Sequence, residues 1–284
     1  MEHFTTLIDA ATLAKHVERS DWVLFDCRFE LGNASWGERE YAAGHLPNAH
    51  YLHLDRDLSS PVGDGTGRHP LPDPEQFARA LSTRGVGAEC QLVAYDQGNG
   101  VYASRLWWLA RWIGLGKVAV LDGGLAAWKS AGLPLTQAIP QSAPGPLPIT
   151  MNTGAWLTAD DVDRLRAQPG TLLVDARGPD RFAGRNETID PVAGHVPGAR
   201  NHPFAGNLGP DGRFLDAAAL RRRWSTVLGS LPASAIVAMC GSGVSACQNL
   251  LALEHAGLSG ARLYPGSWSE WIRDPRRPVA TGSF

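Results

Sequence analysis

One cysteine of the chain lies in a sequence that suits a nucleophile. Cys240 follows the apolar run 235–239 and precedes Gly-Ser-Gly-Val-Ser at 241–245, after which a helical pattern begins. A strand, a glycine loop and a helix in this order place the sulfur at the carboxyl edge of a sheet, where open α/β folds bind ligands. Glycines in the loop let backbone N–H groups point inward, and the helix adds its positive end. Such a cradle favours the thiolate, the reactive form of cysteine.

Two other interpretations of this loop compete with a nucleophile. A cysteine that ends a buried strand is often only a packing residue, but the adjacent glycines weaken that interpretation. A Cys-x5-Arg phosphatase loop needs an arginine six residues after the cysteine to bind phosphate. Ala246 stands at that position, so the loop does not fit a phosphatase.

The other three cysteines lack such a loop. Cys27, Cys90 and Cys247 form no C-x-x-C pair, and four cysteines in 284 residues are too few for a disulfide scaffold. We interpret these three as structural free thiols in a reducing compartment. Cys240 and Cys247 with His255 do not have the spacing of a zinc site, so we expect no metal and no organic cofactor.

The same landmarks occur twice along the chain. Asp-x-Arg occurs at 26–28 and 175–177, Gly-His-hydrophobic-Pro at 44–47 and 194–197, and an apolar strand pattern at 92–95 and 236–239. Offsets of 144 to 150 residues are too long for a solenoid and fit two tandem domains. Asp96 follows the first apolar run where Cys240 follows the second. The chemistry is therefore expected in the second half.

The elements that must position Cys240 are those of an α/β fold. Both halves alternate short apolar runs with helical patterns, which predicts mostly parallel sheets flanked by helices. We expect strands at 22–25, 91–94, 118–121, 172–174, 235–239 and 262–264, and helices at 73–84, 102–113, 125–131, 158–167, 216–228 and 244–256. Thr158 and Asp161 predict a capping box with Asp in place of Glu. The predicted domains are 1–135 and 151–284, joined by a proline-rich linker at 136–150.

Composition limits the partners of the chain. The formal net charge is −2 and 44% of the residues are hydrophobic, which fits two globular domains and gives no positive field for nucleic acid. The first residues lack the basic and apolar segments of a secretory signal, and no run approaches the roughly 20 apolar residues of a membrane span. We therefore expect a cytoplasmic protein without nucleic-acid or membrane partners.

The loop at 240–246, Cys-Gly-Ser-Gly-Val-Ser-Ala, together with the paired landmarks, resembles the tandem-domain rhodanese sulfurtransferases, and among them the 3-mercaptopyruvate branch. The resemblance covers nearly the whole chain. It implies two rhodanese-like domains of which the first is a catalytically silent copy, in agreement with Asp96 at the cysteine position. It also implies that Cys240 carries a persulfide, which is formed from a small-molecule sulfur donor and passed to cyanide, a thiol or a dithiol protein.

The residues after Cys240 bear on the donor. Thiosulfate rhodaneses resemble one another in having Arg and Lys directly after the cysteine, whereas this loop has Gly241 and Ser242. A dianionic sulfonate needs two cations and a keto-acid carboxylate one, so the neutral loop favours 3-mercaptopyruvate. Thiosulfate:cyanide sulfur transfer is the alternative. A non-catalytic sulfur carrier or partner-binding module is a third interpretation, because Asp96 shows that the scaffold tolerates loss of its cysteine.

The loop itself supplies most of the predicted site. The backbone N–H groups of residues 241 to 245, among them Gly241, Gly243, Val244 and Ser245, are expected to cradle the anion. The Ser242 hydroxyl is placed either to bond the departing enolate or keto oxygen of the donor, or only to satisfy a backbone group.

Residues outside the loop are assigned by the resemblance. Arg181 matches the family arginine that binds the donor carboxylate. A second family arginine, in a Glu-Pro-Arg segment, has no counterpart at 186–191, and Arg185 is the candidate substitute. His45 matches a histidine proposed to act with a carboxylate and the loop serine. His195 holds the same motif in the other half, however, which favours a structural role for both histidines.

Overall fold

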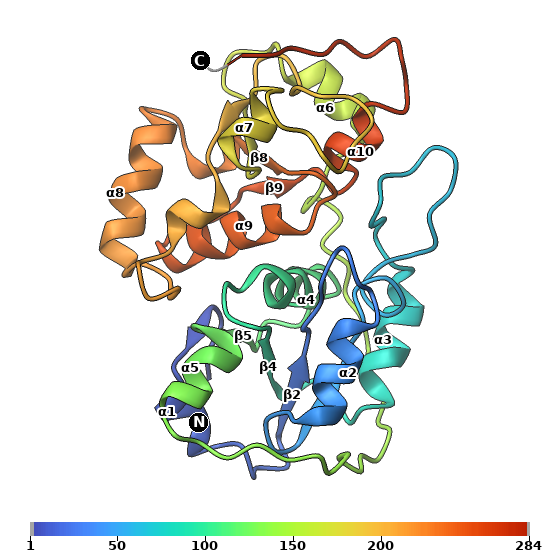
Figure 1. Cartoon of the computed structure of the whole chain (residues 1–284), viewed down its shortest axis with the longest axis vertical. Helices are drawn as coiled ribbons and strands as arrows, with labels where there is room; N and C mark the ends of the chain where they lie inside the picture. Colours follow the sequence, from blue (N-terminus) through green and yellow to red (C-terminus); the bar gives the residue numbers. More distant parts are fainter. Residues whose placement is uncertain (1–2, 283–284) are drawn as a thin grey trace. The chain divides into compact units, whose positions relative to one another are not determined.

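The computed structural model describes residues 3–282, which form two units (Figure 1). The first unit consists of Met1–Ser60, Leu71–Asn152 and Pro210–Phe214, and the second of Pro61–Pro70, Thr153–Gly209 and Leu215–Phe284. Each unit thus contains a short segment from the other half of the chain, which the predicted boundaries did not include. The expected linker packs on the first unit, where Thr136 pairs with His45 and the Thr150 N–H donates to the Ile113 carbonyl.

The first unit is built on a five-stranded parallel sheet with the order β1-β5-β4-β2-β3. Its strands are β1 Leu7–Ile8, β2 Trp22–Asp26, β3 Ala49–Tyr51, β4 Gln91–Tyr95 and β5 Val118–Leu121. Its helices are α1 Ala10–Ala14, α2 Trp36–Ala43, α3 Pro74–Ser82, α4 Val101–Trp112 and α5 Gly124–Ser130. Strands β2 and β4 are buried at every residue, as central strands of a parallel sheet covered on both faces must be.

The second unit repeats this arrangement with a four-stranded parallel sheet in the order β7-β6-β8-β9. Its strands are β6 Leu172–Asp175, β7 Arg200–Asn201, β8 Ile236–Met239 and β9 Arg262–Leu263. Its helices are α6 Ala159–Leu165, α7 Pro179–Phe182, α8 Ala217–Leu228, α9 Ser245–His255 and α10 Ser267–Trp271, with 3-10 turns η1 Phe204–Asn207 and η2 Ala233–Ala235. The order matches β3-β2-β4-β5 of the first unit, so the internal sequence repeat is a repeat of the fold.

The repeated sequence landmarks join two neighbouring parts of each unit. Asp26 accepts the backbone N–H of Arg28 at 2.9 Å and forms an ion pair with its guanidinium, and this guanidinium donates to the Gly44 carbonyl at 2.8 Å. Arg177 repeats both contacts with Asp175 and with the Gly194 carbonyl. The Asp-x-Arg and Gly-His-hydrophobic-Pro motifs therefore meet in space, and their recurrence reflects the scaffold.

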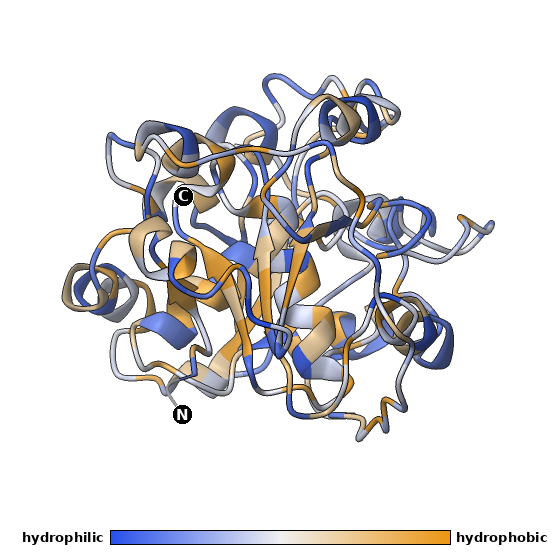
Figure 2. Ribbon diagram, turned by 90° about the horizontal axis from the view of Figure 1, so that it is seen from below, coloured by the Kyte–Doolittle hydropathy of each residue, from blue (hydrophilic) through white to orange (hydrophobic). Residues whose placement is uncertain are grey.

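All six predicted strands and six predicted helices are present, with ends that differ by a few residues. The strands and helices without a predicted counterpart are β1, β3, β7, α1, α2, α7 and α10. The capping box at α6 is confirmed, because Thr158 Oγ1 accepts the Asp161 N–H and Asp161 Oδ2 accepts the Thr158 N–H. Figure 2 shows hydrophobic residues concentrated on the strands. Within residues 3–282, no helix combines the length and the apolar character needed to cross a bilayer.

Candidate active site

Cys240 directly follows β8 and is buried at the start of the loop that leads into α9. Its Sγ accepts the Gly243 N–H at 3.1 Å, and its own N–H donates to Ser267 Oγ at 3.0 Å. Gly243 has a φ of +75°, and a Cβ there would lie 2.2 Å from the Pro265 carbonyl oxygen. Only glycine permits this turn, because any side chain would collide with backbone. The loop thereby fixes a backbone N–H on the sulfur.

The remaining loop residues lie as the chain order predicts. The Gly241 carbonyl accepts the Ser269 N–H at 2.9 Å, which ties the loop to α10. Val244 is buried and caps α9, and Ser245 is the first residue of that helix. Residues 241 to 245 therefore form a turn at the N-terminus of α9, in which the Gly243 N–H bonds the sulfur.

Ser242 is bonded to a histidine that the sequence analysis did not select. Ser242 Oγ lies 2.7 Å from Nδ1 of His69, and both side chains are buried. His69 belongs to the segment 61–70, which is part of the second unit. A Cβ at Gly67 would lie 2.4 Å from the Gly266 carbonyl oxygen, so this glycine permits the segment to pack closely against the turn before α10.

His45, the histidine selected from the motif, lies in the first unit with its ring nitrogens facing the carbonyls of Tyr41 at 2.8 Å and Ala138 at 3.2 Å. His195 repeats the arrangement, with Nδ1 2.8 Å from the Phe182 carbonyl. Each ring also stacks on its neighbouring aromatic ring at 3.8 Å between centroids. His45 thus bonds two backbone carbonyls, and the histidine bonded to the loop serine is His69.

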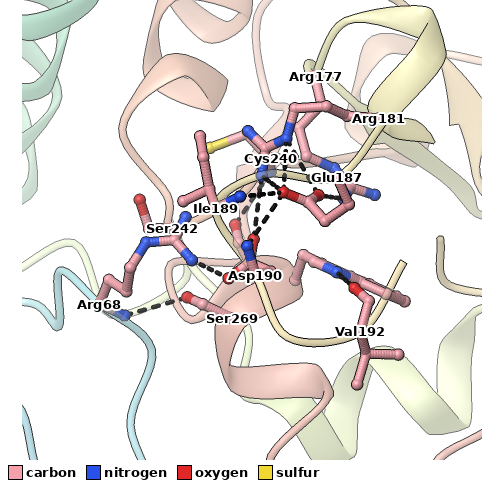
Figure 3. A network of polar contacts seen from close by, with 12 residues as sticks. Arg68, Arg177, Arg181, Glu187, Ile189, Asp190, Val192, Cys240, Ser242 and Ser269 are labelled. Carbon is pink, nitrogen blue, oxygen red and sulfur yellow. Dashed lines mark hydrogen bonds and ion pairs between the residues drawn. The ribbon is translucent and has the colours of Figure 1, made fainter. Parts of the chain in front are cut away.

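A row of alternating charges runs along one side of the loop (Figure 3). Its members are Arg177, Glu187, Arg181, Asp190 and Arg68. The Glu187 carboxylate lies 3.5 Å from Nη1 of Arg177 and 3.0 Å from Nη2 of Arg181. The same Nη2 lies 3.0 Å from Oδ2 of Asp190, and Oδ1 of Asp190 forms an ion pair with Arg68. We call these five residues the charged row.

The two carboxylates of the charged row differ in their preference for the ionised state. Burial acts to raise the pKa of Glu187, but the Arg181 guanidinium and the N–H groups of Ile189 and Asp190 outweigh it and lower this pKa. At Asp190 burial outweighs Arg68 and Arg181, and the pKa is raised. Glu187 therefore favours the ionised state more strongly than Asp190 does.

Two arginines of the charged row approach Gly241, the residue after Cys240. A Cβ at Gly241 would lie 2.8 Å from Nη2 of Arg68 and 3.6 Å from Nη2 of Arg181. Arg181 thus lies beside the cysteine loop. Arg185 does not join it, because its guanidinium pairs with Asp180 at 2.7 Å on the surface, where the Arg185 side chain is 61% exposed.

Two residues of this constellation, Arg68 and His69, were missed by sequence reasoning. They lie far from the cysteine loop in the chain, in a segment without helical or strand periodicity. The available signal was a charged residue and a histidine between Gly67 and Pro70, because conspicuous polar residues in such a loop often belong to a site. Within the described residues, no group of three or more His, Cys, Asp or Glu side chains is arranged to hold a metal ion.

Two parallel α/β units, one with a cysteine at the strand-to-helix turn and the other with Asp96 there, define the class of the protein. The model of the rhodanese-like domain matches residues 9–131 and again 158–274. The chain therefore belongs to the rhodanese family, with two copies of its domain.

Relatives cover the full length of the chain. A Pseudomonas aeruginosa protein named "Probable 3-mercaptopyruvate sulfurtransferase" is 50% identical over 278 residues, which is 97% of this chain and 98% of the relative. A Mycobacterium tuberculosis protein named "Putative thiosulfate sulfurtransferase SseB" is 39% identical over 287 residues, 98% of this chain and 97% of the relative. The crystal structure of SseA from Escherichia coli, described as a 3-mercaptopyruvate sulfotransferase, superposes with a TM-score of 0.80 at 31% identity, over 94% of this chain and 100% of that one.

Proposed function

We propose that this protein is a sulfurtransferase that takes sulfur from 3-mercaptopyruvate onto Cys240 and passes it to a thiol, a dithiol protein or cyanide. The observation that carries the proposal is the loop after Cys240, in which a neutral glycine-serine turn holds the sulfur while an arginine, Arg181, stands beside it. The names of the Pseudomonas and Escherichia relatives support this donor.

The donor is a monoanion with a keto group next to its carboxylate, and the site offers a partner for each. Arg181 keeps Nη1 near the space above Gly241 while its Nε and Nη2 bond Glu187 and Asp190. A guanidinium bonds a carboxylate through parallel N–H groups. The hydroxyl of Ser242, supported by His69, is available to the keto oxygen. This pairing orients the donor with its thiol toward Cys240.

The first half of the reaction forms one S–S bond and breaks one C–S bond. The Cys240 thiolate attacks the thiol sulfur of 3-mercaptopyruvate, and the electron pair of the C–S bond goes to the leaving carbon as the enolate of pyruvate. The proton of the donor thiol passes to the enolate carbon, which gives pyruvate and leaves Cys240 as a persulfide anion. Ser242 bonded to His69 can stabilise the enolate oxygen and relay this proton, a general acid–base role.

The second half returns the enzyme to its thiolate. An acceptor thiolate or cyanide attacks the outer sulfur of the persulfide, and Cys240 leaves with the electron pair of the S–S bond. Cyanide becomes thiocyanate, whereas a dithiol first becomes a persulfide and then closes to a disulfide with release of sulfide. The four cysteines of the chain are free in the structure. Thiols that must stay reduced for turnover suit a cytoplasmic location.

Thiosulfate remains the second candidate donor because two arginines, Arg68 and Arg181, approach the space above Gly241. The mycobacterial relative also carries the name of a thiosulfate sulfurtransferase. Against it stand Glu187 and Asp190, whose carboxylates offset much of the positive charge of the neighbouring arginines and leave too little for a dianion. This partly offset charge suits the monoanion better.

The deciding experiment compares kcat/KM for the two donors, with cyanide and with a dithiol as acceptors. We expect 3-mercaptopyruvate to exceed thiosulfate by at least about 100-fold, because a misplaced donor loses about that much. Cys240→Ser is the blank, and mass spectrometry after donor treatment should find one added sulfur atom in the wild type alone. Preference for thiosulfate would reverse the donor assignment. Equal binding of partners by wild type and Cys240→Ser, without turnover by either, would favour the carrier interpretation.

A further inference from the structure

The site contains a second cation that the motif of the second half does not supply. Arg68 comes from the segment 61–70, yet its Nη2 is the atom nearest to a Cβ built on Gly241, at 2.8 Å. Arg181 approaches the same point with Nη2 at 3.6 Å and Nη1 at 3.7 Å. Two guanidinium groups therefore converge on one small space directly beside the nucleophile (Figure 3).

Asp190 holds these two like charges together. One of its oxygens pairs with Arg68 and the other with Arg181, so the carboxylate bridges the guanidinium groups. Its side chain is only 2% exposed, whereas those of Arg68 and Arg181 are 25% and 23% exposed. The bridge is thus buried behind the arginines, which keep a side accessible to an incoming anion.

Arg68 also has unused donor capacity. Its Nη1 bonds Asp190, but its Nε is buried and has no hydrogen-bond partner among the described residues. A buried N–H without an acceptor is costly, and most such groups in folded proteins are paired. Asp190 is the first anion on Arg68. A ligand carboxylate that bonds Nε and Nη2 would give the Nε–H its missing acceptor, in the bidentate geometry that carboxylates prefer.

The backbone around Arg68 fixes its position. The Arg68 N–H donates to Ser269 Oγ at 3.0 Å, the preceding Gly67 packs against Gly266, and the following His69 bonds Ser242. These three contacts join the segment to both sides of the cysteine loop. Arg68 is therefore held on a docked segment, which limits the conformational freedom it must lose on binding a ligand.

We propose that Arg68 is a substrate-binding residue that clamps the donor carboxylate together with Arg181, in the role for which sequence reasoning offered Arg185. The inference rests on the proposed function, because it takes 3-mercaptopyruvate as the donor. Two guanidinium groups with one bridging carboxylate form a receptor for a single carboxylate. Arg68 thereby contributes to donor specificity.

The test is the steady-state kinetics of Arg68→Gln with 3-mercaptopyruvate. We expect kcat/KM to fall about 30-fold, the effect of losing a charge-assisted contact, with most of the change in KM. Arg68→Lys keeps the charge without the planar fork and should recover only part of the loss. Pyruvate, the carboxylate product, should inhibit Arg68→Gln more weakly than the wild type.

The controls separate ligand binding from general effects. Arg276→Gln removes an exposed arginine that pairs with Asp274 and should keep kcat/KM within about twofold, as surface changes usually do. Alkylation of Cys240 by neutral iodoacetamide, and the melting temperature, should stay near wild type in Arg68→Gln. Release of sulfur from an already formed persulfide to a dithiol should also be unchanged, because the donor carboxylate has then left.

The outcomes distinguish the two proposals. If the wild type turns over 3-mercaptopyruvate and Arg68→Gln behaves like Arg276→Gln, the role of Arg68 is overturned and the proposed function stands. If Arg185→Gln shows the loss instead, the second anchor is Arg185. If the wild type does not use 3-mercaptopyruvate, the proposed function fails, and the inference fails with it.

Discussion

The loops that follow β4 and β8 occupy the same position in the two units but carry different residues. In the first, Asp96 is fully buried and its carboxylate accepts the N–H groups of Gly98, Gly100, Tyr102 and Ala103 at 2.9 to 3.3 Å. In the second, the Cys240 sulfur accepts the Gly243 N–H. The first loop shows that a strand-to-helix turn of this fold binds an anion attached to Cβ. A persulfide on Cys240 would be such an anion, with its outer sulfur about as far along the side chain as an aspartate oxygen.

The residue after each of these positions differs between the two loops. Gln97 follows Asp96, and its amide exchanges hydrogen bonds with the Phe29 backbone. Gly241 follows Cys240 and has no side chain, and the arginines approach the space that it leaves. Two of the differences between the loops are therefore Cys240 in place of the fixed carboxylate of Asp96 and Gly241 in place of Gln97.

Cys240→Asp tests the first change most directly, because it gives the second loop the residue of the first. We expect turnover to fall by at least about 10⁴-fold, as for the loss of a nucleophile, while the melting temperature stays near that of the wild type, since loop N–H groups can bind the carboxylate. Sulfur transfer and thermal unfolding measure the two effects. Cys90→Ser, at a half-buried cysteine of the first unit, is the control and should remain active.

The two loops also differ two residues further along, where the second has Ser242 and the first has Gly98. Ser242, with its partner His69, is therefore the next feature to test. We expect Ser242→Ala and His69→Ala each to lower kcat about 100-fold, the usual contribution of a proton-transferring group. The double variant should lose little more, since the two side chains act through one 2.7 Å contact. Additive losses in this double-mutant cycle would mean that the residues act independently.

Gly241→Ala gives the second loop a side chain at the position where the first loop has Gln97. The new methyl group would lie 2.8 Å from Nη2 of Arg68 and must displace this guanidinium by a few tenths of an ångström. We expect kcat/KM for the donor to fall about tenfold, equivalent to about 1.4 kcal/mol. Gly65→Ala, at an exposed position with nothing within 4 Å, is the matched control. A Gly241→Ala enzyme as active as this control would show that the space above the loop is not used.

Asp96→Asn should have the smallest effect on turnover and a clear effect on stability. The asparagine amide would turn its NH₂ toward backbone N–H groups that now donate to the carboxylate, leaving two of them unsatisfied in the buried loop. We expect unfolding in urea to lose about 2 kcal/mol and kcat to stay within about twofold. A variant that is fully stable but inactive would give the first loop a part in the chemistry.

The fold was predictable because its determinants are local. Each central strand is a short continuous apolar run, α4 and α5 each begin after a glycine, and α6 begins at the capping residue Thr158. The cysteine loop was predictable for the same reason, since strand, glycine turn and helix are adjacent in the chain. Two-residue strands such as β1 carry too few residues for a periodic signal, and only their pairing with neighbours reveals them.

The rest of the site depends on tertiary packing. Arg68 and His69 reach the loop because Gly67 allows the segment 61–70 to dock on the turn before α10, and no local pattern specifies that contact. Arg185 was selected for its proximity in the chain to Arg181, but Asp180 holds it at the surface. The motif around His45 recurs at His195 in the other half of the chain, and both rings bond backbone carbonyls.

The passage of residues 61–70 into the second unit bears on how such a duplicated chain can evolve. A copy that has lost its own nucleophile would ordinarily be free to decay or to be deleted. Here the copy that carries Asp96 also encodes the arginine and the histidine that stand at the surviving cysteine. The second half alone would therefore contain Cys240 without Arg68 and His69, two of its neighbours. Selection on one active site is then enough to preserve both copies.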